Sequence, residues 1–223
     1  MVRTHRSQQR DVIPRWIGRT LREDDGDDPD DLTGLLHKET ASRPHAGAPT
    51  ARQHTRIGLA AGPRVPVVCM KCNSGWMSDL ERAVQPIITP LFLGQVPPGG
   101  ARLRPEDLRV VSSWATKTAL VHDFSNGTPT VTTDETRERF FEIREPPSGG
   151  EVWIASYHAP PGFMWKLDEC VLAQGELADK DDLALVTISI RHLILQVWID
   201  FRLDGTRPSA YLSLTNNPFL TRI

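Results

Sequence analysis

Two cysteines, Cys69 and Cys72, are separated by two residues in the stretch VPVVCMKCNSGWMSDLERAV, and Asn73 follows them directly. Such a pair suits half of a tetrahedral zinc site, because a turn between a short strand and a helix brings both sulfurs to one ion. Two other interpretations stay open: a redox dithiol, and two buried, unreactive cysteines. The redox dithiol is disfavoured because no βαβ pattern surrounds the pair. We therefore favour the zinc half-site.

A zinc shell needs two ligands beyond these sulfurs. The nearby nitrogen donors lack the spacing of a dedicated ligand pair; they are His5, His37, His45 and His54. The third cysteine, Cys170, lies in the strand-like DECVLAQ and is most simply a small buried apolar residue. Asn73 offers an amide oxygen that can either cap a helix or ligate a divalent cation such as Mg²⁺ or Mn²⁺. The zinc shell is thus incomplete as the sequence stands.

The composition is that of an ordinary soluble protein, with 39% hydrophobic and 24% charged residues and a net charge of −2. No apolar run approaches the roughly 20 residues that span a bilayer, and the arginine-rich start lacks the apolar core of a secretory signal. Three cysteines are too few for a disulfide framework. We therefore expect a cytoplasmic protein without a membrane partner. The motifs of kinases, dinucleotide-binding enzymes, α/β-hydrolases and zincins are missing from the sequence.

Charge is unevenly distributed along the chain. The run REDDGDDPDD carries seven acids in ten residues, which repel one another and predict a solvated loop. No acid occurs between Ala41 and Cys72, where basic residues alternate with Pro, Gly, Ser, Thr and Ala. This pattern predicts a flexible arm that ends in the short strand RVPVVC. The basic residues could contact nucleic-acid phosphates or merely solubilise the arm; the candidates are Arg10, Arg15, Arg52, Arg56, Arg64 and Lys71.

Apolar periodicity predicts an α+β fold. A helix follows Cys72, with a capping box formed by Ser78 and Glu81 and a bend or end at Pro86. Two more helices fit RPEDLRVVSSWATKTALVHDF and DETRERFFEIRE. Strands fit EVWIASY, ALVTISI and HLILQVWIDF, of which the last two form an antiparallel hairpin around Arg191, and SAYLSL adds an edge strand. We thus predict a basic N-terminal module over 1–94, and over 95–223 an α+β domain of two helices followed by an antiparallel sheet.

Several stretches resemble a family of actinobacterial HNH endonuclease-like proteins. CMKCNSGWMSDLE resembles the second half of the family's motif and DVIPRWIG its first half, and the similarity continues through WATKTALV, RFFEIREPPSGGEVWIASY and ISIRHLILQVW. The resemblance implies a small ββα-metal, treble-clef-like module at the N-terminus. It also implies metal-dependent hydrolysis of DNA, structural zinc at Cys69 and Cys72, and a catalytic Mg²⁺ or Mn²⁺ at Asn73. We further expect Trp16 and Trp76, beside the two half-motifs, to pack together.

The first half-motif departs from the family. There a Glu-His pair precedes VIPRW and its histidine activates water, whereas Arg10 and Asp11 stand at these positions here. Asp11 could ligate a cation, but an unperturbed aspartate pKa of about 3.9 makes a poor general base. The segment before DVIPRW is also too short for the family's upstream cysteine pair.

We therefore predict an HNH-like protein that binds DNA, with Asp11 and Asn73 as candidate catalytic residues. The alternative is a non-catalytic binding or assembly protein that keeps a remnant zinc knuckle. In either case the C-terminal domain could bind a second copy or another protein.

Overall fold

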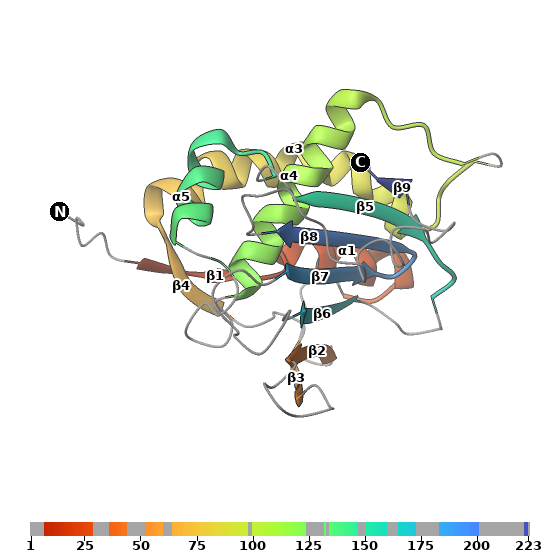
Figure 1. The fold of residues 1–223 in the computed structure, drawn as a ribbon. Helices are drawn as coiled ribbons and strands as arrows, with labels where there is room; N and C mark the ends of the chain where they lie inside the picture. Colours follow the sequence, from red (N-terminus) through yellow and green to blue (C-terminus); the bar gives the residue numbers. More distant parts are fainter. Residues whose placement is uncertain are drawn as a thin grey trace.

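The computed structural model describes residues 7–28, 36–43, 52–59, 64–97, 100–123, 132, 134–146, 150–159, 165–172, 183–200 and 221–222. Helices and strands alternate in blocks rather than one by one (Figure 1). Along the chain the elements are β1 (Ser7–Asp11), α1 (Arg15–Asp25), β2 (Leu36–Arg43), β3 (Arg52–Leu59), β4 (Arg64–Cys69), α2 (Met70–Ser74), α3 (Trp76–Phe92), α4 (Pro105–His122), α5 (Asp134–Ile143), β5 (Glu151–Ser156), β6 (Trp165–Leu172), β7 (Leu183–Ile190), β8 (Leu193–Asp200) and β9 (Thr221–Arg222).

The larger sheet has the strand order β3-β2-β6-β7-β8-β5-β9, and its neighbours are antiparallel except for β2 and β6. Its centre is the hairpin of β7 and β8, in which Ile190 pairs with Leu193 across a turn of Arg191 and His192. Arg191 has a φ of 42°, in the left-handed region that tight hairpin turns use. The predicted α+β class, the hairpin and the strand EVWIASY are confirmed. Cys170 lies on β6, as predicted, and SAYLSL falls outside the described residues.

One hydrophobic core joins the helices to this sheet. α3 packs along α4, and both helices pack against β8. The core includes Ile17 and Leu21 of α1, Phe92 of α3, Trp114 of α4 and Leu195 of β8. Residues on both sides of position 94 therefore contribute to a single core. The division into two domains at this position stays a prediction.

α4 confirms the predicted second helix but is more deeply buried than an amphipathic pattern suggests. Every residue from Val111 to Asp123 is buried, so the helix is covered on all sides rather than along one face. Small and hydroxyl side chains make this possible, because their polar atoms can bond to the helix backbone. The Thr118 hydroxyl, for example, donates to the Trp114 carbonyl at 2.9 Å. α5 confirms the third predicted helix and ends at Ile143, before Arg144 with a φ of 63°.

α3 differs from its prediction at both ends. It begins at Trp76 after Gly75, which provides no side-chain cap, so the predicted capping box of Ser78 and Glu81 is wrong. It also continues through Pro86 to Phe92, so the helix does not end at Pro86, and the alternative of a bend there stays a prediction. The carbonyl that loses its partner is that of Arg82. Arg82 and Pro86 are both exposed, so this carbonyl lies on the solvent side, where water can bond to it.

The acidic run is also partly ordered, contrary to our expectation of a solvated loop. α1 extends through Asp24 and Asp25, and Gly26 ends it with a φ of 79°. The Arg191 guanidinium donates to Asp24 at 2.6 Å and to both carboxylate oxygens of Asp25 at 2.6 Å. This bidentate ion pair offsets the repulsion between the two acids and ties the end of α1 to the β7–β8 turn.

The basic arm likewise contains regular structure. β3 occupies part of the segment predicted to be flexible and pairs with β2 from Leu36–Leu59 to Arg43–Arg52. The pairing requires β2, which the sequence pattern did not reveal. Within the described residues, every helix is too short or too polar to cross a bilayer.

Candidate metal and nucleic-acid site

The segment that carries DVIPRW lies beside the strand that leads to the cysteines. β1 pairs antiparallel with β4 in a separate two-stranded sheet, where Ser7 is opposite Cys69 and Asp11 is opposite Arg64. The register shifts between Gln8 and Gln9, next to Pro66 on β4. A bulge is expected there because proline cannot donate to the ladder. Two strands alone are marginally stable, and here α2 packs against both.

The two cysteines form a tight turn at the end of β4. Cys69 is the N-cap of α2, and its sulfur accepts a hydrogen bond from the Cys72 backbone N–H at 3.3 Å. Both cysteines are half-buried and neither forms a disulfide. They can supply two thiolates to one ion. Among the residues that the structure describes, no group of three or more His, Cys, Asp or Glu side chains could hold a metal. The described part of the chain thus provides two of the four ligands of a zinc site.

The two thiols differ in acidity. Hydrogen bonds from the Cys72 side chain and backbone lower the pKa of Cys69, because they stabilise its thiolate. Burial, helped by the neighbouring Cys69, raises the pKa of Cys72 to about 11. Cys69 is therefore deprotonated more often than Cys72, and it is the more reactive of the two toward a metal or an electrophile.

This difference predicts selective alkylation. Near pH 8, iodoacetamide should modify Cys69 at least about tenfold faster than Cys72, since thiolate is the reactive form. Trypsin cuts after Lys71 and so places the two cysteines in separate peptides, Val65–Lys71 and Cys72–Arg82, which mass spectrometry quantifies independently. Equal rates in the folded protein would contradict the assignment, and the unfolded protein serves as the control in which the rates should converge.

The candidate catalytic residues occupy different parts of this module. Asp11 is at the end of β1 that lies away from Cys69. Its partner Arg64 is five positions before Cys69 on β4, which is about 16 Å along the strand. The Asp11 carboxylate forms an ion pair with Arg15 at 3.1 Å. Asn73 is half-buried on α2, one residue after Cys72. The pairing of β1 with β4 joins the half-motifs, and the roles of Asp11 and Asn73 stay predictions.

The candidate phosphate-binding residues fall into two groups. Arg10, Arg15 and Arg64 lie on β1, α1 and β4, toward the end of the two-stranded sheet that is far from Cys69, whereas Lys71 lies on α2 within the cysteine turn. Arg52 and Arg56 lie on β3, at the edge of the larger sheet, which Figure 1 shows apart from the β1–β4 pair. Lys71 is exposed, whereas the Arg15 guanidinium is shared with Asp11. Lys71 is therefore the better placed of these two for a phosphate contact.

The two tryptophans do not pack together, contrary to our expectation. The Trp16 ring lies 6.2 Å from that of Phe92, and the Trp76 ring lies 6.0 Å from that of Phe140. Since Trp76 and Phe92 are the first and last residues of α3, the tryptophans sit near opposite ends of a helix about 24 Å long. Each packs against the core separately.

A buried ion pair that sequence reasoning missed links the cysteine module to α4. The Lys117 ammonium donates to the Glu81 carboxylate at 2.9 Å, and the Lys117 side chain is 1% exposed. Glu81 belongs to the helix that follows the cysteines, and Lys117 belongs to WATKTALV. Both residues lie in stretches that the sequence analysis singled out, but the pairing joins positions 36 residues apart and no local pattern reveals it.

Comparison of the chain with family models, with curated proteins and with solved structures finds no match.

Proposed function

We propose that the chain is an HNH-like nucleic-acid-binding protein in which β1, β4, α2 and α3 form a ββα-metal type module. The observation that supports this most directly is the antiparallel pairing of β1 with β4, with Ser7 opposite Cys69. This pairing places the strand that ends at Asp11, the first residue of DVIPRW, beside the strand that leads to the cysteine turn, and α2 and α3 follow β4 along the chain. Both stretches resemble halves of the same HNH endonuclease-like motif, which supports assigning them to one module.

Zinc would bind to this module through Cys69 and Cys72. The hydrogen bond to the Cys69 sulfur favours the thiolate that a metal requires. Two sulfurs do not complete a tetrahedral shell, so the described residues by themselves do not fit a closed structural site. We accordingly assign to the module no reaction step that depends on zinc.

Nucleic-acid binding is tested by the fluorescence anisotropy of labelled duplex DNA at increasing salt. The logarithm of the binding constant should fall linearly with the logarithm of the salt concentration. Lys71→Ala should reduce the magnitude of this slope by about 0.9, the contribution of one phosphate contact. Arg82→Ala is the matched control, because Arg82 is exposed on α3 and already paired with Asp79 at 3.1 Å. The absence of binding at low salt, or an equal effect of both variants, would count against the proposal.

Phosphodiester hydrolysis is the second part of this proposal and is tested separately. Asp11, held in an ion pair with Arg15, replaces a histidine base, so we expect slow nicking of supercoiled plasmid with Mg²⁺ or Mn²⁺. Asn73→Ala should abolish it, and Ser74→Ala, an exposed neighbour on the same short helix, should leave it unchanged. If the protein binds DNA but does not cleave it with either Mg²⁺ or Mn²⁺, the proposal of hydrolysis is wrong and the protein is a non-catalytic binding protein.

A further inference from the structure

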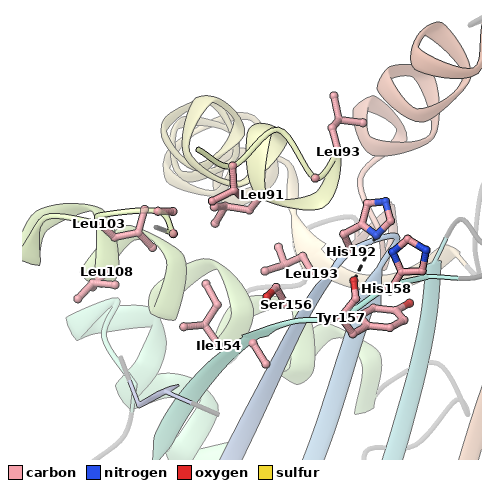
Figure 2. Close-up of a pocket in the computed structure, with 15 residues that line it drawn as sticks. Leu91, Leu93, Leu103, Leu108, Ile154, Ser156, Tyr157, His158, His192 and Leu193 are labelled. Atoms are coloured by element: carbon pink, nitrogen blue, oxygen red, sulfur yellow. Dashed lines mark hydrogen bonds between the residues drawn. The ribbon is translucent and has the colours of Figure 1, made fainter. Parts of the chain in front are cut away.

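A cleft of about 760 Å³ lies away from the cysteine turn, where the C-terminal end of α3 meets β5 and the β7–β8 turn. Its volume falls within the range of small-molecule sites, roughly 300 to 1,000 Å³. Figure 2 shows two unlike ends: Leu103 and Leu108 at one end and the imidazole rings of His158 and His192 at the other, with Leu193 between them. The cleft is thus amphipathic along its length.

The apolar end is aliphatic. Side chains from α3, the loop before α4, the first turn of α4 and the sheet form its wall; they include Leu91, Val96, Leu103, Leu108 and Ile154. No aromatic ring lines this end among the described residues, so it offers no platform for stacking a nucleobase. A branched aliphatic wall instead favours a flexible hydrocarbon, whose burial releases about 0.8 kcal/mol per methylene group.

The polar end consists of His158, His192 and Tyr157. The two imidazole rings stack with their centroids 5.7 Å apart. Each imidazole carries at least one N–H donor, and burial raises the pKa of Tyr157 to about 12, so its hydroxyl stays neutral at physiological pH. Since no acidic side chain lines the described part of the cleft, an anionic group at this end meets donors and no like charge.

His192 is held rigidly in this position. Its backbone N–H donates to the Phe92 carbonyl at 3.1 Å, and its carbonyl accepts from the Tyr157 N–H at 3.0 Å. Its Nδ1 lies 3.2 Å from the Tyr157 carbonyl oxygen and 3.3 Å from the Ala159 nitrogen. Because Nδ1 accepts the hydrogen bond from the Ala159 N–H, the proton of the neutral ring is on Nε2, and a ligand would meet this nitrogen as a donor. Gly94 lies so close to the ring that a Cβ there would be 2.9 Å from Cδ2.

We propose that this cleft is a binding site for a small aliphatic carboxylic acid, with the hydrocarbon against the leucines and the carboxylate at His158 and His192. The pre-formed polar end favours such a ligand because a rigid donor set loses little conformational entropy on binding. The proposal is independent of nucleic-acid binding, since the cleft contains no residue of β1, β4 or α2 among those described, and Leu91 lies at the end of α3 that is far from the cysteine turn.

Decanoate is the probe, and isothermal titration calorimetry on the full chain is the measurement. Decanoate should bind saturably, and decanol, which keeps the chain but lacks the charge, should bind about tenfold more weakly. In parallel, decanoate should shift the imidazole ¹H–¹³C resonances of His158 and His192, assigned with single-histidine variants. Equal affinity for acid and alcohol, titration without saturation, or shifts confined to other histidines would overturn the proposal.

Two variants locate the ligand. Ala101→Trp fills the apolar part from an exposed loop position and should weaken decanoate binding at least about tenfold, while Arg82→Trp, on an exposed face outside the cleft, should not. His158→Ala should weaken decanoate about fivefold and leave decanol unchanged, because an exposed imidazole contributes a hydrogen bond rather than packing. Circular dichroism checks that each variant is folded, and unchanged decanoate binding by both cleft variants would overturn the assignment.

Discussion

Replacing Lys117 with alanine is expected to lower the free energy of unfolding by about 3 kcal/mol. The Lys117 side chain is 1% exposed, its ammonium lies 2.9 Å from Glu81, and it sits 5.6 Å from the centre of the Trp114 ring. Alanine removes this partner from a half-buried carboxylate and leaves a cavity in the packed face of α4. Breaking a buried pair from one side costs roughly 3 to 5 kcal/mol, and the 19% exposure of Glu81 places the expected loss at the lower end.

The matched control is Arg82→Ala, one residue beyond Glu81 on the same helix. Arg82 forms a pair of similar length with Asp79, at 3.1 Å, but the side chains are 73% and 67% exposed. We expect the free energy of unfolding to change by about 0.5 kcal/mol or less, as measured by urea unfolding followed by circular dichroism. Lys117→Met combined with Glu81→Gln should recover part of the loss, because the charges are removed together. A Lys117→Ala protein as stable as Arg82→Ala would show that burial contributes nothing to this pair.

Local patterns predicted those elements whose signals are contained within the element. α4 begins with a proline and two acids in its first turn, and the β7–β8 hairpin consists of two alternating runs joined by two residues. Both are confirmed. β1 and β2 carry no such signal, because SQQRD and LHKETASR have little apolar alternation. They are strands because partners distant in sequence, β4 for β1 and β3 and β6 for β2, supply the hydrogen bonds.

In the candidate site too, local patterns predicted only the features that depend on neighbouring residues. The spacing of Cys69 and Cys72 predicted a turn that brings both sulfurs together, and the hydrogen bond from the Cys72 N–H to the Cys69 sulfur is consistent with it. The order of the acidic run could not be predicted, because it depends on Arg191, more than 160 residues away. His192 was likewise missed. A histidine in a hairpin turn has no local signature, and its surroundings come from α3 and β5.

Replacing Phe92 with alanine is expected to lower the free energy of unfolding by about 4 kcal/mol in a single transition. Phe92 is fully buried, its ring lies 6.2 Å from that of Trp16, and its carbonyl accepts from the His192 N–H at 3.1 Å. It therefore lies where α1, α3 and the β7–β8 turn meet. Phenylalanine to alanine changes in a core cost roughly 3 to 5 kcal/mol, because the surroundings collapse only partly around the cavity.

Phe141→Ala is the control, since Phe141 is 46% exposed and meets the Trp76 ring edge to face. We expect this variant to lower the free energy of unfolding by about 1 kcal/mol or less. Circular dichroism and tryptophan fluorescence should report coincident urea transitions in both variants, because residues before and after position 94 share one core. A Phe92→Ala protein with two separate transitions, only one of them shifted, would instead show that the cysteine module and the sheet domain unfold independently.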